Sequence, residues 1–167
     1  MPGSLNDILP EPISEENEAI ILDLLKRKMT VSLDLAVQLL IAMEKRFGPE
    51  VSEVVQQMAK EQDFPAEDEF GLPNEDLWKF CSMIDHAAAG SHRWERVIEE
   101  GDRIGYQFSL CMYAEILNEL GKPELGRVMC ARDGPWVKSY NPKLGFRRTK
   151  TLMEGDEYCD HIFLVED

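Results

Sequence analysis

The chain has 167 residues, of which 44% are hydrophobic and 30% are charged. These fractions are typical of a globular protein that buries its own core, and they exclude a disordered chain or a membrane-spanning one. With 32 acidic against 18 basic side chains the formal net charge is −14. That charge repels phosphate backbones and anionic lipids, so neither nucleic acid nor a membrane is expected as a partner. We expect one domain over residues 1–167, either alone or in an oligomer such as a homodimer.

The N-terminus has no basic start followed by an apolar run, so nothing marks the chain for export and we expect a cytoplasmic protein. In that compartment Cys81, Cys111, Cys130 and Cys159 are expected to be thiols and not a disulfide framework. No two of them have the CxxC spacing of a local zinc site. We therefore expect neither a metal nor a cofactor.

Apolar residues recur at three- and four-residue steps over residues 1–90, which predicts a helical portion. Ser14 is the expected N-cap of a first helix that ends near Lys28. Ser32 is the expected N-cap of a second helix, which ends at Gly48. Both helices have an apolar face suited to packing.

Pro49 follows, and its fixed backbone angle suits the first turn of a third helix. Residues 63–73 are acidic and contain two prolines and a glycine, so they predict an exposed connection. Asn74 is the expected N-cap of a fourth, core helix that ends near Gly90.

After Gly90 the hydrophobic period becomes two, which predicts strands. A hairpin is expected around residues 94–108 with its turn at 99–102, followed by a helix over 110–120. Three more strands are expected over residues 128–131, 146–152 and 158–165. The prediction is an α+β fold with N-terminal helices packed on a C-terminal antiparallel sheet of about five strands. Residues 91–167 would then be mainly β with one helix, and would carry the site.

The stretch from Arg147 to His161 concentrates residue types that carry chemistry: three basic side chains, two threonines, a Gly-Asp turn, a thiol and an imidazole. A basic cluster in an acidic protein suits a small anionic ligand, because arginine holds a carboxylate through two parallel hydrogen bonds. A salt-bridged strand surface explains Arg147 and Lys150 equally well, since alternation sends one of two adjacent residues to solvent.

A strand through Arg148 places Arg148 and Thr149 on opposite faces, and the sequence does not select the inward one. The turn at residues 154–157 is expected to join this strand to the last one. Cys159 would then be a cross-strand neighbour of Arg148 or Thr149.

Cys159 and His161 share one face of the last strand, where a nearby cation lowers the pKa of a thiol and activates it as a nucleophile. Side chains two apart on a strand are about 7 Å apart, which is long for a direct hydrogen bond, so a buried inert thiol is an equal alternative. Cys81, on an apolar helix face, is expected to be structural. Cys111 and Cys130 are open to either role.

The loop at residues 131–136 is expected to place Asp133 at a strand end, where its carboxylate can polarise water. A turn-forming aspartate before Gly134 is the equal alternative. Three cysteines with Asp133, Asp160 and His161 would offer metal ligands from distant parts of the chain. The separations of 19 and 29 residues between those cysteines carry no metal-binding signature.

Three stretches resemble the L-2-amino-thiazoline-4-carboxylic acid hydrolase family: Cys111 followed by a helix, Val-Met-Cys-Ala-Arg-Asp at 128–133, and above all Arg-Thr-Lys-Thr-Leu-Met-Glu-Gly-Asp at 148–156 with Cys-Asp-His-Ile-Phe at 159–163. The resemblance covers roughly residues 90–165. One departure is Met112, which stands where proline is expected and puts the role of the preceding cysteine in doubt.

The resemblance implies an enzyme that opens a thiazoline ring by adding water at the carbon between nitrogen and sulfur, which yields N-carbamoyl-cysteine. Such a reaction needs a carboxylate clamp, a base or nucleophile, and a proton donor for the departing sulfur. We expect Arg148 as the clamp, Cys159 or an Asp133-activated water as the attacking group, and His161 or Cys130 as the proton carrier. The full set of candidates is Cys159, Asp133, His161 and Cys130 for catalysis, and Arg148, Thr149, Thr151 and Cys111 for substrate binding.

The same arrangement is similar to small-molecule-binding domains related to the vinyl reductase group, which sense or carry ligands without turnover. That alternative predicts saturable binding of a small anionic ligand and no product. A third alternative, a pure interaction module, predicts neither binding nor turnover.

Overall fold

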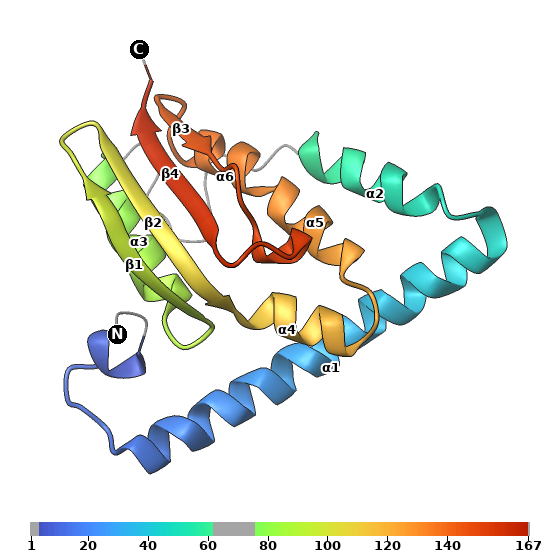
Figure 1. Ribbon diagram of the computed structural model, residues 1–167, viewed down its shortest axis with the longest axis horizontal. Helices are drawn as coiled ribbons and strands as arrows, with labels where there is room; N and C mark the ends of the chain where they lie inside the picture. Colours follow the sequence, from blue (N-terminus) through green and yellow to red (C-terminus); the bar gives the residue numbers. More distant parts are fainter. Residues whose placement is uncertain (1–3, 62–75, 167) are drawn as a thin grey trace.

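The computed structural model describes residues 4–61 and 76–166 (Figure 1). Four strands form one antiparallel sheet in the order β1-β2-β4-β3, so the last strand in the sequence lies inside the sheet. The α+β architecture expected from the sequence is confirmed, with four strands where about five were expected. The elements in chain order are η1 (Leu5–Asp7), α1 (Glu15–Phe47), α2 (Val51–Lys60), α3 (Leu77–Ala88), β1 (His92–Glu99), β2 (Arg103–Cys111), α4 (Met112–Glu119), α5 (Glu124–Ala131), α6 (Asp133–Tyr140), β3 (Leu144–Arg147), η2 (Leu152–Glu154) and β4 (Cys159–Val165).

The ends of the first helices follow the predicted signals. Ser14 caps α1 by accepting a backbone hydrogen bond from its first turn, and Gly48 ends α1 with a positive φ of 109° that suits glycine. The helix predicted to follow Pro49 is α2. The fourth predicted helix is α3, which Asp76 caps. The predicted cap Asn74 and the predicted connection at residues 63–73 lie outside the described residues.

The break predicted between two N-terminal helices is wrong, because α1 is continuous over 33 residues. The hydroxyl of Thr30 donates to the carbonyl of Lys26 (2.8 Å), and that of Ser32 donates to the carbonyl of Lys28 (3.1 Å). A hydroxyl that bonds back one turn is satisfied inside the helix and does not cap a new one. Long as α1 is, neither it nor any other helix of residues 4–61 and 76–166 is apolar enough over a sufficient length to cross a membrane.

Residues 128–131 end the helix α5, where the sequence predicted a strand, and α6 follows directly. Periodicity does not distinguish a four-residue apolar strand from a buried helical turn. The packing explains the helix: α5 lies on η2, and a Cβ atom at Gly126 would collide with the side chain of Met153. The described part of residues 91–167 therefore holds three α-helices, where one was predicted.

The core lies between one face of the sheet and the helices α3 and α6, which pack on β2, β4 and β3. Ile104, Tyr106 and Phe108 alternate along β2 and are at most 4% exposed, so this strand turns one full face inward. The ring of Phe80 on α3 packs against Phe163 on β4, with ring centroids 5.2 Å apart. This aromatic layer joins α3 to the middle of the sheet.

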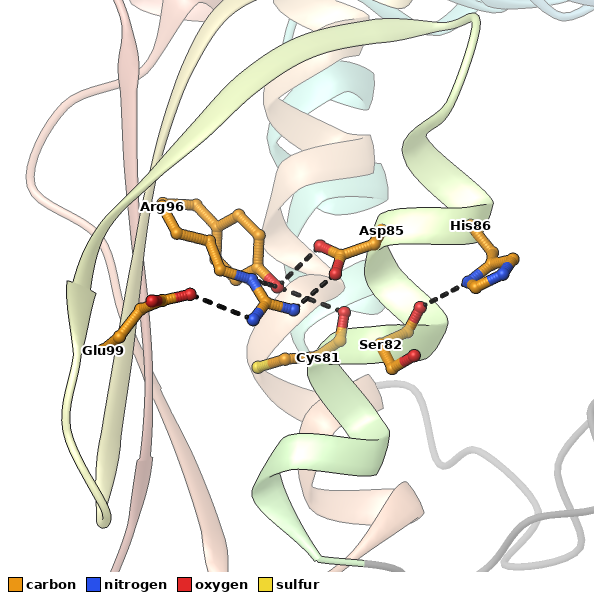
Figure 2. A network of polar contacts seen from close by, with 7 residues as sticks. Cys81, Ser82, Asp85, His86, Arg96 and Glu99 are labelled. Carbon is orange, nitrogen blue, oxygen red and sulfur yellow. Dashed lines mark hydrogen bonds and ion pairs between the residues drawn. The ribbon is translucent and has the colours of Figure 1, made fainter. Parts of the chain in front are cut away.

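A polar network fastens α3 to the hairpin β1–β2 beside this core. The guanidinium of Arg96 on β1 donates to Asp85 on α3 and to Glu99 (3.2 Å), and Figure 2 shows Arg96 between these two carboxylates. The hydroxyl of Tyr106 lies 2.9 Å from Asp85 and accepts from Arg96 Nε at 3.1 Å. Burial, the largest influence, and the neighbouring groups Cys81 and Asp85 raise the pKa of Tyr106, so this hydroxyl remains a hydrogen-bond donor.

Asp85→Ala is expected to destabilise the fold by about 2 to 3 kcal/mol, because it leaves the mostly buried guanidinium of Arg96 without its inner partner. Glu99→Ala is the matched control, since it removes the half-exposed partner of the same arginine and should cost less than about 1 kcal/mol. Urea denaturation of both variants measures the difference. Equal losses in the two variants would contradict the structural role of the inner pair.

Candidate functional site

A cavity of about 330 Å³ lies between α3, the inward face of the sheet, α5 and α6. Its walls are mainly apolar and aromatic, and a few titratable side chains are set into them. Small-molecule sites have this character, with apolar walls and a few placed polar groups. The lining residues are Ile84, Ala87, Ala88, Ser91, His92, Phe108, Cys111, Tyr113, Met129, Cys130, Asp133, Trp136, Val137, Phe146, Met153, Cys159, His161 and Phe163.

The strand β4 supplies one row of the cavity wall. Its alternation turns Cys159, His161 and Phe163 to the inward face, which the sequence alone did not select. The predicted cross-strand neighbours of Cys159 are wrong, because its partner in the ladder is Phe108 on β2. The strand β3 ends at Arg147, which pairs with Ile162, and the chain then leaves the sheet.

Two aspartates shape the connection between β3 and β4. The carboxylate of Asp160 accepts hydrogen bonds from the backbone N–H and hydroxyl of Thr149 (2.8 and 2.5 Å) and from the N–H of Lys150. Asp156 accepts from the N–H of Thr151 (2.7 Å). Backbone N–H groups that donate to these two carboxylates need no partner on a neighbouring strand. Residues 148–158 therefore form a loop that contains η2, in place of the predicted hairpin.

An ion pair closes the wall at the start of α6. Arg148 Nη1 donates to Asp133 Oδ2 at 2.6 Å, and Nη2 donates to the carbonyl of Cys130 at 3.2 Å. The guanidinium also lies over the ring of Phe146, 5.6 Å from its centroid. Burial raises the pKa of Asp133 to about 6, although the charge of Arg148 opposes that rise. Asp133 thus titrates close to neutral pH inside the cavity.

Three thiols line the same cavity, and none of the four cysteines forms a disulfide. Burial is the main reason that the pKa of Cys111 rises to about 11 and that of Cys130 to about 12. The sulfur of Cys159 accepts a hydrogen bond from the N–H of Leu152 (3.2 Å) and lies 3.7 Å from the hydroxyl of Thr151. Backbone N–H groups therefore act on the sulfurs of two cavity thiols, from Leu152 on Cys159 and from Tyr113 and Ala114 on Cys111.

Two neutral imidazoles also line the cavity. Burial lowers the pKa of His161 to about 3 and that of His92 to about 4. The ring of His161 packs among Phe108 (4.8 Å) and Phe146 (5.1 Å), and its buried Nε2 has no hydrogen-bond partner within the described chain. A buried polar atom left unpaired at a cavity wall is available to a ligand.

The structure brings most of the predicted site residues together. Five line the cavity: Cys159, Asp133, His161, Cys130 and Cys111. Arg148 and Thr151 are not lining residues but contact them. Arg148 donates to Asp133, and the hydroxyl of Thr151 lies 3.7 Å from the sulfur of Cys159. Thr149 is exposed, and its polar groups bind Asp160, so it is not brought to the cavity. Cys81 lies in the core, as expected.

Other lining residues gave no sequence signal. His92 opens β1, and Tyr113 and Trp136 come from α4 and α6. They are separated along the chain and carry no motif, so only tertiary packing identifies them. Across residues 4–61 and 76–166, no three histidine, cysteine or acidic side chains cluster in a way that could hold a metal ion.

A family model described as L-2-amino-thiazoline-4-carboxylic acid hydrolase matches residues 26–163, so the match extends into the helical portion as well as the sheet. No curated protein is significantly similar to the chain. One solved structure, the phenol-responsive sensory domain of the transcription activator PoxR with phenol, is 12% identical with a TM-score of 0.43. The similarity covers 81% of this chain and 74% of that one. At that distance it carries no argument about function.

His161→Phe is expected to reduce acid destabilisation of the fold. The folded protein keeps His161 neutral down to a pKa of about 3, whereas the unfolded chain takes up the proton near 6.5. The unfolded state therefore binds more protons between these values, and stability is lost as the pH falls from about 6.5. Replacing the imidazole of His161 should therefore reduce the loss of unfolding free energy on acidification, by up to about 1.4 kcal/mol for each pH unit.

Urea denaturation at pH 7, 6 and 5 measures this slope for the wild type and for His161→Phe. His86→Asn is the control, because His86 is exposed on α3 outside the cavity. An unchanged slope in His161→Phe would contradict the neutral, buried imidazole.

Proposed function

Because the chain belongs to the L-2-amino-thiazoline-4-carboxylic acid hydrolase family, we propose that it opens a small carboxylated heterocycle, such as a thiazoline, by adding water. The observation that carries this proposal is the carboxylate of Asp133, which faces a mainly apolar cavity and is oriented by Arg148. A fixed carboxylate with a pKa near 6 is suited to take a proton from water at neutral pH.

In the proposed reaction a water molecule attacks the ring carbon between nitrogen and sulfur while Asp133 accepts one of its protons. The carbon–sulfur bond then breaks, and the oxygen remains on the carbon as a carbonyl. The two protons of the water end on the ring nitrogen and on the departing sulfur. The product is an N-carbamoyl amino acid with a free thiol, so the atoms balance with water as the second reactant.

Arg148 is the proposed clamp for the substrate carboxylate. Since its guanidinium already donates to Asp133 and to the Cys130 carbonyl, a bound carboxylate would share it with Asp133. A second anion beside Asp133 raises the pKa of that carboxyl further, which strengthens it as a base. Binding of the substrate and activation of water are thereby linked through one cation.

The proton for the departing sulfur has two nearby carriers. Cys130 is a protonated thiol at neutral pH because its pKa is about 12, and His161 offers an unpaired Nε2. Cys159 is the alternative nucleophile, because the N–H of Leu152 stabilises charge that develops on its sulfur. Attack by Cys159 would leave a covalent adduct that water later releases.

Asp133→Asn is expected to lower kcat/KM by about 10² to 10⁴-fold, since the amide cannot accept the proton of water. The assay incubates the full chain with L-2-amino-thiazoline-4-carboxylate and measures N-carbamoyl-cysteine by mass spectrometry. Glu157→Gln is the control, because Glu157 is an exposed carboxylate outside the cavity. Wild-type activity in Asp133→Asn would remove the proposed base.

Cys159→Ala separates the two attacking groups. If water attacks directly, this variant retains turnover within about tenfold, and no adduct mass appears on the wild-type protein. If Cys159 attacks, turnover is abolished in Cys159→Ala, and the wild type shows a mass increase under single-turnover conditions. Cys111→Ala is the comparison, because it removes another buried thiol from the same cavity wall and so separates loss of the nucleophile from loss of a lining side chain.

A second candidate function is ligand binding without turnover. It is favoured by the thiols of Cys111 and Cys130 and the imidazoles of His92 and His161, which burial keeps uncharged at neutral pH. A cavity of this kind holds a small ligand without activating it. Saturable binding of the thiazoline carboxylate by calorimetry, with no product after long incubation, would assign this function in place of hydrolysis.

A further inference from the structure

The longest helix of the protein exposes a continuous apolar stripe. Leu24, Val31, Leu35 and Leu39 on α1 are 60%, 74%, 75% and 60% exposed, and Ile20 extends the row toward the N-terminus. Steps of four and seven residues place them on one side of the helix. The opposite side of α1 carries Val37 and Leu40, which are buried against the rest of the molecule, so α1 is apolar on two faces.

The stripe is large for the surface of a monomer. It runs about 30 Å along α1 and, with Ile21, exposes roughly 600 Å² of apolar side chain, at the upper end of the patches found on monomeric proteins. A standard interface buries roughly 800 Å² on each partner, which the stripe reaches once the stems of flanking residues such as Arg27 and Lys28 are added. Figure 1 shows α1 along one border of the molecule, where a second body can approach it.

We propose that this stripe pairs two copies of the chain through antiparallel contact of their α1 helices, with the two-fold axis near Val31. The midpoint of Glu15–Phe47 is residue 31, so the most exposed apolar side chains would lie at the centre of the interface. A two-fold contact needs one self-complementary surface, which a stripe centred on the axis provides.

The charges at the ends of α1 select the antiparallel orientation. Glu15 and Glu16 lie in its first turn, and Lys45 and Arg46 lie in its last. Antiparallel pairing brings the acidic end of each helix beside the basic end of its partner, whereas parallel pairing would oppose like charges. The net charge of −14 also disfavours an anionic lipid surface as the occupant of this stripe.

Light scattering on the full-length protein tests the pairing. We expect twice the mass of 19.1 kDa for the wild type. The dimer Kd should increase by at least about 100-fold for Val31→Glu, which opposes like charges at the axis, and for Leu35→Glu, which buries a charge in the apolar centre of the interface. Val97→Glu is the matched control, since Val97 is 54% exposed on β1 and should leave the dimer intact. Circular dichroism checks that each variant is folded.

Disulfide trapping tests the orientation. Under mild oxidation Val31→Cys should crosslink two copies, whereas Leu24→Cys should not, because its two sulfurs would lie about 20 Å apart along antiparallel helices. Crosslinking of both would indicate parallel pairing and overturn the proposed geometry. A monomeric wild type, an unchanged mass in the glutamate variants, dissociation of Val97→Glu, or binding of the wild type to phosphatidylcholine vesicles would each overturn the proposal.

Discussion

The position of β4 inside the sheet is the constraint on which the site depends. Hydrogen bonds to β2 on one edge and β3 on the other fix its register, so its side chains cannot slip by one residue without reversing face. That register sends Cys159 and His161 inward beside Phe163. The same strand therefore supplies core packing at one end and polar groups of the cavity at the other.

The cavity combines an apolar wall with a few polar groups whose charge states are set by burial. Desolvation keeps the thiols of Cys111 and Cys130 protonated and the imidazoles neutral, while Arg148 limits the rise in the pKa of Asp133. At neutral pH the charge at the cavity is therefore concentrated in one ion pair. The proposed activation of water rests on the carboxylate of this ion pair.

The loop between β3 and β4 shows that residues typical of active sites also serve as structure. Asp156 and Asp160 are bound to backbone N–H groups of the loop, and they hold Thr151 against the sulfur of Cys159. Polar contacts of this kind fix the position of cavity residues without lining the cavity. The Arg96 network plays a comparable part on the other side of the core, where it holds α3 against the hairpin.

By itself the sequence determined the α+β class, the caps at Ser14 and Gly48, the final strand and the cluster of candidate residues, because hydrophobic period and capping signals are local. The continuity of α1 has a local reason, because the hydroxyls of Thr30 and Ser32 bond back one turn and cap no new helix. Tertiary structure decided that residues 128–131 are helical, since the packing of α5 on η2 outweighed the local signal. It also decided which face of β4 is inward and that His92 reaches the cavity. Those outcomes depend on contacts between residues far apart in the chain, and no local pattern carries that information.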